Sequence, residues 1–189
     1  MINITLAELL IRAFDCTDDI AYVNESITLL RDVLKSPVIP FPRLHIIQGL
    51  IAALLFRFLW FREMVDAEEM MQLYPIAAAD TCAEMTRRFD ISCQWVMLVR
   101  YYRHPSTSTA YESAISLMKD SLVFDPTLEI QHNRLVSRRV EYETLPLDFA
   151  SHQIDIGQLE QAIELWNGVE AFSGLRCVAC ACQFTNTVS

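Results

Sequence analysis

The feature that most constrains the fold of this chain is an internal repeat of helical segments. Four stretches with apolar residues at helical spacing can be aligned: NESITLLRDVL, AEEMMQLYPIA, YESAISLMKDSL and LEQAIELW. Their central residues are Ser26, Met70, Ala114 and Ala162, at intervals of 44, 44 and 48 residues. A nearly constant period of this length is typical of arrays in which each helical hairpin buries its apolar side against the next hairpin.

The residues between these stretches supply the other helix of each hairpin. The periodicity predicts helices at 3–14, 19–35, 44–61, 66–88, 90–103, 107–123, 127–142, 146–156 and 158–170. Pro75 predicts a kink or a fresh start, Pro146 a break, and Gly157 the last turn. Only four glycines are present, which also favours helices over a turn-rich β fold, and 52% apolar residues are enough for a continuous core. We therefore expect an all-α fold, a right-handed α-solenoid of antiparallel helix pairs.

One repeat domain of about four helix pairs is expected over residues 1–172, followed by a poorly ordered tail at 173–189. Within it, the stretch HPSTST at 104–109 could be a group of nucleophiles beside a base or the start of a helix. Thr109 followed by Glu112 fits a capping box, and Asp125-Pro126 would end the same helix. No glycine-rich nucleophile turn accompanies the hydroxyls. We therefore predict capping, no catalytic residue and no enzyme activity.

Charge and hydropathy argue against two classes of partner. A net charge of −9 opposes attraction to nucleic acid and to anionic membranes. The sixteen-residue apolar stretch at 46–61 contains Gln48 and Arg57 and is shorter than the roughly twenty residues of a membrane span, so a buried helix is expected. The start of the chain lacks the pattern of a secretory signal. A cytoplasmic location follows, with no nucleic acid and no membrane as partner.

The six cysteines predict neither disulfides nor a metal. Without a secretory signal, paired disulfides are not the default. Three of them, Cys177, Cys180 and Cys182, form CVACAC, but no fourth zinc ligand follows. The four histidines make no Cys-His pairing; they are His45, His104, His132 and His152. We expect no metal and no cofactor, and keep a cysteine-dependent or metal-binding activity of the tail as an alternative.

Part of the chain resembles a known repeat family. Ala150, Gly157, Ala162 and Trp166 resemble the tetratricopeptide (TPR) pattern of small residue, turn glycine, small residue and aromatic. Over residues 6–166 the chain resembles the repeat region of fungal TPR proteins that end in a caspase-like CHAT peptidase domain. The segments that carry this likeness are AFDCTDDIAYVNESITLLRDVL, the spacing from Arg57 to Asp66, HPSTSTAYESAISLMKDSLVFDPTLEIQH and LPLDFASHQIDIGQLEQAIELW.

The resemblance implies a scaffold that binds a protein or peptide, or that regulates a CHAT-type peptidase. The sequence departs from the family after residue 164, where LWNGVEAFSGLRCVACACQFTNTVS replaces the run into the peptidase, so no catalytic residue is carried over. An alternative is a non-functional truncated fragment. Terminal helices without capping repeats would also favour self-association.

Overall fold

The structure is a computed structural model that describes residues 2–36, 43–123 and 137–164. These residues form α-helices and the turns between them. The helices are α1 (Ile2–Thr17), α2 (Ile20–Lys35), α3 (Arg43–Phe61), α4 (Met64–Ala78), α5 (Met85–Tyr101), α6 (Thr107–Val123) and α8 (Arg139–Asp155). The chain divides into two compact units, Met1–Tyr102 and Arg103–Ser189, and each is described by itself.

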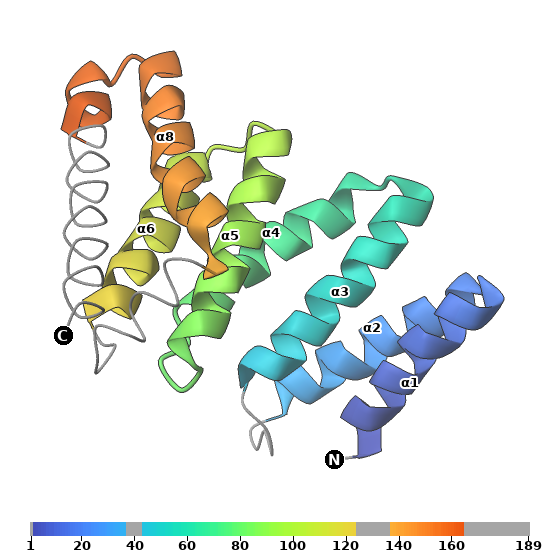
Figure 1. Cartoon of the computed structure of the whole chain (residues 1–189). Coiled ribbons are helices and arrows are strands. Elements are labelled where there is room, and N and C mark those ends of the chain that lie inside the picture. Colours follow the sequence, from blue (N-terminus) through green and yellow to red (C-terminus); the bar gives the residue numbers. More distant parts are fainter. Residues whose placement is uncertain (1, 37–42, 124–136, 165–189) are drawn as a thin grey trace, which may run out of the picture. The chain divides into compact units, whose positions relative to one another are not determined.

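In the first unit, consecutive helices pack against each other in sequence order. α1 packs on α2, α2 on α3, α3 on α4 and α4 on α5, and α1 also touches α3. α1, α3 and α5 run in about the same direction, and α2 and α4 return between them (Figure 1). The expectation of an all-α chain with helices packed as neighbouring pairs is confirmed for the described residues.

The repeat is visible in how the helices end. Asp18 and Arg62 follow α1 and α3 in the left-handed region, with φ of 55° and 60°, and their sequence separation is the 44-residue interval. Each donates its backbone N–H to the equivalent carbonyl four residues earlier, Phe14 at 2.8 Å and Phe58 at 2.7 Å. Gly157, predicted to mark the last turn, follows α8 with φ of 81°. A residue with positive φ therefore follows helices in both units, although Gly157 donates its N–H to Ile154, three residues earlier.

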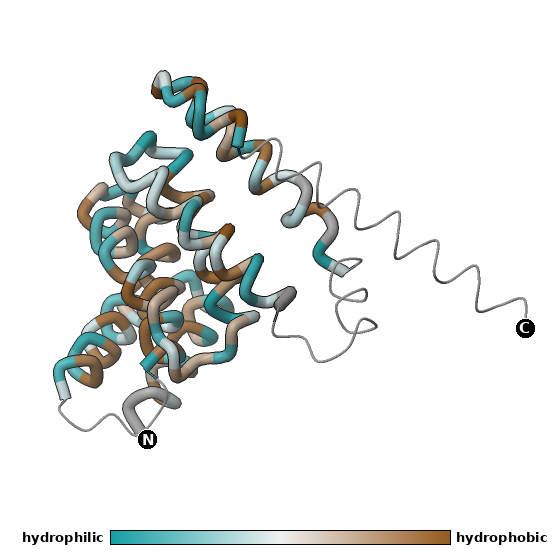
Figure 2. Tube along the Cα trace, turned by 90° about the vertical axis from the view of Figure 1, so that its left-hand side faces the viewer, coloured by the Kyte–Doolittle hydropathy of each residue, from teal (hydrophilic) through white to brown (hydrophobic). Residues whose placement is uncertain are grey.

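The four aligned positions all lie in the interior. Ser26, Met70 and Ala114 are fully buried, and Ala162 is 5% exposed. The Ser26 hydroxyl donates to the backbone oxygen of Ala7 at 3.1 Å, which requires a close approach of α1 and α2. A small side chain permits this approach. Figure 2 shows hydrophobic and hydrophilic residues interspersed along the helices, as expected where one side of a helix packs on its neighbours.

Two predicted boundaries are wrong. The helix expected at 66–88 is two helices, because α4 ends at Ala78 and α5 begins at Met85. Asp80 makes the turn between them: its side chain accepts the backbone N–H of Cys82 at 3.0 Å, and its backbone oxygen accepts that of Ala83 at 3.1 Å. A short carboxylate that captures nearby backbone donors competes with the helix.

The break expected at Pro146 is also absent. Pro146 lies inside α8, where Leu145, Phe149 and Ala150 are buried. The ring of Phe149 stacks on that of Tyr111 of α6 with centroids 5.0 Å apart. Packing of α8 on α6 therefore outweighs the backbone hydrogen bond that the proline cannot make. Most of the helix predicted at 127–142, and Asp125-Pro126, lie outside the described residues.

The HPSTST stretch begins α6, but Thr109 is not the cap. The helix starts at Thr107, so Thr109 lies within its first turn. The His104 backbone oxygen accepts the Thr107 N–H at 3.0 Å and the Thr107 hydroxyl at 2.6 Å. The Ser106 carbonyl accepts the N–H of Ala110 at 3.0 Å. The stretch therefore forms the turn that precedes α6, but the predicted cap at Thr109 is wrong, and in the contact that Thr107 makes with His104 its hydroxyl donates to a carbonyl instead of accepting a helix N–H.

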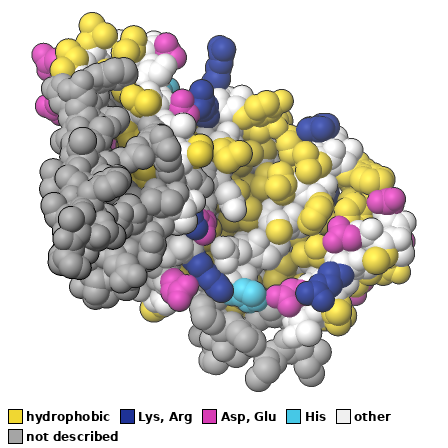
Figure 3. Space-filling view, in the orientation of Figure 1, with side chains coloured by type: hydrophobic (Ala, Val, Ile, Leu, Met, Phe, Trp, Pro, Cys, Tyr) yellow, Lys and Arg dark blue, Asp and Glu magenta, His cyan; other side chains and the backbone are white. Residues whose placement is uncertain are grey.

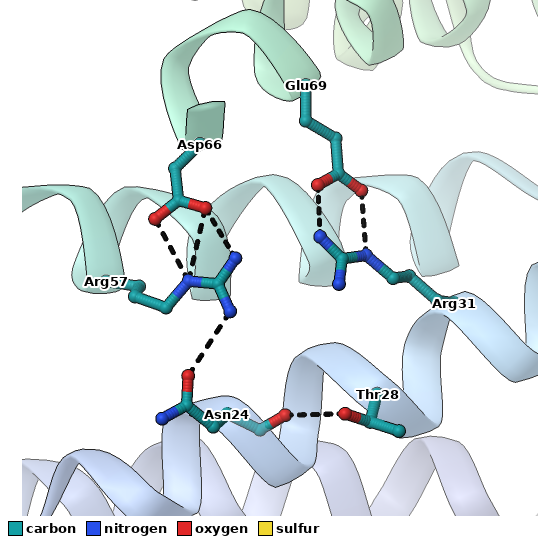
Figure 4. Close-up of polar contacts among 6 residues, drawn as sticks. All are labelled: Asn24, Thr28, Arg31, Arg57, Asp66 and Glu69. Carbon is teal, nitrogen blue, oxygen red and sulfur yellow. Dashed lines mark hydrogen bonds and ion pairs between the residues drawn. The ribbon is translucent and has the colours of Figure 1, made fainter. Parts of the chain in front are cut away.

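A buried ion pair fixes the orientation of α3 (Figure 4). The Arg57 side chain donates from Nε to both carboxylate oxygens of Asp66 at 3.1 and 3.0 Å, and from Nη1 to the Asn24 side-chain oxygen at 3.2 Å. The Asp66 side chain is 1% exposed and that of Arg57 is 20% exposed. One guanidinium thus ties together α2, α3 and the first turn of α4.

A second, more exposed pair joins α2 to α4. Arg31 donates from Nε to a Glu69 carboxylate oxygen at 2.9 Å, and from Nη2 to the other oxygen. The hydrogen bond to Glu69 raises the pKa of Arg31, so this guanidinium stays charged. The side chains are 37% and 25% exposed, and solvent therefore screens this pair more than the Arg57–Asp66 pair.

We expect Asp66→Asn to lower the free energy of unfolding by about 3 kcal/mol, because it leaves Arg57 without its charge partner in a mostly buried position. Glu69→Gln is the matched control and should cost less than about 1 kcal/mol, because its partner is more exposed. Urea unfolding followed by circular dichroism measures both. If both substitutions lowered the free energy of unfolding by the same amount, the greater importance of the buried pair would be contradicted.

The buried Tyr74 side chain makes the stability of the fold depend on pH under alkaline conditions. Tyr74 is 5% exposed, and burial raises the pKa of its phenol to about 12. An unfolded tyrosine ionises near about pH 10, so the folded state holds this proton more tightly. The resulting stability is complete below about pH 10 and is lost as the pH rises toward about 12.

We therefore expect the free energy of unfolding to fall by about 2 kcal/mol over this window. Tyr74→Phe cannot ionise and should show a flatter profile. Urea unfolding at a series of pH values between about 9 and about 12 measures the difference. If the phenylalanine variant lost stability as steeply as the parent chain, Tyr74 would not be the responsible group.

Candidate functional site

The three described histidines each bond a different partner. His45 of α3 bonds Glu8 of α1 at 2.9 Å, and His104 bonds the Ser106 hydroxyl at 2.7 Å. His152 of α8 lies 3.2 Å from the Ser108 hydroxyl and stacks beside Tyr111 and Phe149. His132 lies outside the described residues.

The described cysteines also occupy separate segments. Cys16 lies in α1, Cys82 in the turn after α4 and Cys93 in α5. Among the residues that the structure describes, no three His, Cys, Asp or Glu side chains are grouped so as to hold a metal ion. Cys177, Cys180 and Cys182 lie outside those residues, so the tail hypothesis stays a prediction.

Aromatic contacts set α1, α3 and α5 side by side in the first unit. Phe14 of α1 meets Phe56 and Trp60 of α3, each with ring centroids 5.7 Å apart. On another side of α3, Phe58 meets Tyr102 edge to face at 5.7 Å. Each of these contacts adds roughly 1 kcal/mol beyond area burial. α3 is therefore held from both sides by rings.

These contacts and the Arg57 ion pair leave one side of α3 uncovered. At 100° per residue, Phe56 points toward α1, Arg57 toward α4 and Phe58 toward Tyr102 after α5. The remaining direction belongs to Leu55 and Leu59, which are 40% and 50% exposed. Leucines four residues apart share one face of a helix, so they form an apolar stripe that is partly exposed to solvent.

α5 carries a similar stripe. Met97 and Tyr101 are four residues apart and are 72% and 79% exposed. The Tyr101 ring packs edge to face on Tyr102 with centroids 4.9 Å apart. Burial raises the pKa of Tyr102, Tyr101 adds to this and Arg62 opposes it, so the hydroxyl stays neutral and able to donate at neutral pH.

We call these four exposed apolar residues of α3 and α5 the odd-helix face: Leu55, Leu59, Met97 and Tyr101. Figure 3, in the orientation of Figure 1, shows hydrophobic side chains gathered over α3 on this side of the molecule. Arg62, at the end of α3, lies with its guanidinium carbon 5.9 Å from the centre of the Phe58 ring and adds a cation beside the apolar side chains. Apolar area with polar atoms at its edge is typical of surfaces that bind proteins.

None of these four residues was singled out from the sequence. The available signal was the excess of apolar residues in α3, which has more than one packed side requires. By length and composition alone α3 could cross a membrane, but eight of its residues are buried inside the protein. Much of its apolar character therefore belongs to the core, as expected for 46–61, and Leu55 and Leu59 belong to the odd-helix face.

Comparison with family models, with curated proteins and with solved structures gave no match for this chain. The likeness to TPR and CHAT-associated repeats therefore rests on the residues quoted above. The function has to be argued from the surface that the helices themselves create.

Proposed function

We propose that this chain is a protein-binding scaffold, a TPR-like right-handed α-solenoid that holds a peptide or helix of a partner on the odd-helix face. The observation that carries this proposal is the pair of exposed apolar stripes, Leu55 with Leu59 and Met97 with Tyr101. They lie on helices whose other sides are packed against neighbours. Covering exposed leucine and methionine side chains with a partner lowers the free energy of the complex. The gain in stability is about 25 cal/mol for each Å² of apolar area buried.

The rigidity of the stripes supports the same proposal. The Arg57–Asp66 pair and the contacts of Phe14 and Phe58 hold α3 so that Leu55 and Leu59 keep their direction. A preformed surface loses little conformational entropy on binding, which favours affinity. A partner helix with apolar residues three and four positions apart would match a stripe of this kind.

The kind of partner is inferred from the net charge of the chain and from its resemblance to TPR repeats. The net charge of −9 disfavours nucleic acid, so a protein in the cytoplasm is the proposed partner. The likeness to repeats that precede CHAT domains makes a peptidase of that type one candidate, regulated through contact with the array. Binding would then position the peptidase, with the chemistry supplied by the partner.

Selection of a phage library of helical peptides on the full-length chain tests the proposal. We expect enriched peptides to bind the parent chain, and to bind the Leu55→Asp and Leu59→Asp variants at least about tenfold more weakly, because each carboxylate would be desolvated in the contact. Ile76→Asp is the matched control, since Ile76 is also exposed, at 45%, but lies on α4. Its affinity should be unchanged.

Circular dichroism should show the same helix content for all three variants. Failure to enrich any peptide, or equal binding by the Leu59→Asp and Ile76→Asp variants, would refute the odd-helix face as the binding surface.

A further inference from the structure

The second unit carries an exposed apolar surface on both sides of Gly157. Its large apolar residues are each between 48% and 60% exposed; they are Ile154, Ile156, Leu159 and Ile163. Leu159 and Ile163 are four residues apart in the helical stretch 159–164, so they share one side of it. We call these four apolar residues the Gly157 surface.

The charge around the Gly157 surface is negative. Asp155, Glu160 and Glu164 stand next to its apolar residues in the sequence, and all three are exposed. None of these carboxylates forms an ion pair with another described residue. The sequence from residue 140 to residue 164 contains six acidic residues and no lysine or arginine. The exposed apolar side chains are therefore set among acidic side chains that lack a described cation partner.

The odd-helix face of the first unit has cations at its edge instead. α3 contains no aspartate or glutamate, although the chain has 24 acidic residues. Arg62 follows α3 and lies over the Phe58 ring, and within the described residues it forms no ion pair, even with Glu63 beside it in the sequence. Arg100 is exposed and stands three residues after Met97, so the two are neighbours on the surface of α5.

The repeat shows that the end of α3 does not require an arginine. Asp18 stands 44 residues before Arg62, has nearly the same φ, and donates its backbone N–H to the equivalent carbonyl. An acidic residue therefore completes the same helix end in α1. The positive charge of Arg62 is not needed to close this turn and is left for a ligand of opposite charge.

We propose that the Gly157 surface of one copy of this chain binds the odd-helix face of a second copy. The two surfaces are complementary, because both are apolar and exposed while Glu160 and Glu164 can meet Arg62 and Arg100. A second copy is the chosen occupant because this chain itself supplies an exposed apolar helix side with the charge that the odd-helix face lacks.

This inference rests on the proposed function, since it takes the odd-helix face as a binding surface and names an occupant for it. The two surfaces in contact are different, so the contact is heterologous and can add further copies. A partner helix that binds the odd-helix face would compete with the second copy. Self-association would therefore regulate access to this face.

Sedimentation equilibrium of the full chain tests the proposal. The contact uses few side chains, so a Kd of about 10 to 100 µM is expected, and the average mass should rise between about 5 and about 500 µM. Arg62→Glu should weaken association at least about tenfold, and so should the double variant Glu160→Arg with Glu164→Arg, because each sets like charges in contact. Ile76→Asp changes an exposed residue outside both surfaces and should associate like the parent chain.

Mixing the two weakened variants separates surface pairing from a folding defect. In the mixture, one contact pairs the original acidic and basic surfaces and the other pairs the two reversed surfaces. Association should therefore return to within about threefold of the parent chain. A loss of fold would not be repaired by mixing, and circular dichroism should show the same helix content for each variant.

A parent chain that stays monomeric over the whole range, or a mixture that associates no better than its components, would overturn the proposal. If selected peptides still bound the odd-helix face of such a monomeric chain, the proposed function would stand and only the second copy would be removed as occupant. If neither peptides nor a second copy bound, the odd-helix face would be refuted together with both proposals.

Discussion

The structure depends on the constraint that no hairpin in this chain can bury its own apolar residues. An isolated pair of helices covers only the sides that face each other, and the remaining apolar area has to be covered by a neighbour. In the first unit packing in sequence order achieves this: α3 packs on α2 and on α4, and its residues Leu50 and Ala53 are buried. Some apolar residues nevertheless remain exposed where their neighbours do not cover them fully. The odd-helix face and the Gly157 surface are two such places.

Polar groups decide how the hairpins are oriented once they are stacked. The Arg57–Asp66 pair is nearly dry on the carboxylate side, and its Coulomb attraction and several hydrogen bonds offset the cost of removing the charge from water. Because Arg57 also bonds Asn24, the pair holds three helices in one arrangement. Such a contact adds little to the free energy of unfolding compared with a purely apolar contact. Its main effect is to select one orientation of α3, because the hydrogen bonds of Arg57 can form only in that orientation. The direction of Leu55 and Leu59 follows from it.

Sequence reasoning succeeded where a local pattern and the packing agreed. The 44-residue alignment identified Ser26, Met70 and Ala114, all of which are buried, and Gly157 occupies the turn that its backbone freedom suggested. It failed where tertiary contacts or a side chain acted against propensity. Asp80 ends a helix whose apolar pattern continues, and Pro146 sits within a helix because Leu145 and Phe149 pack on the second unit's core. Neither effect can be read from a window of residues, because each depends on which donors or rings are near in space.

The sequence by itself determined that the chain is helical, that its helices come in pairs with a regular period, and which positions on each pair are apolar. These properties are local, since helix periodicity and turn residues act over a few positions. The tertiary structure alone decided which apolar residues remain exposed. Leu9 and Ala53 occupy equivalent places in the repeat, yet one is 54% exposed and the other fully buried. The physical reason is that burial is a property of the neighbour as well as of the residue, and the neighbour is assigned only when the hairpins stack.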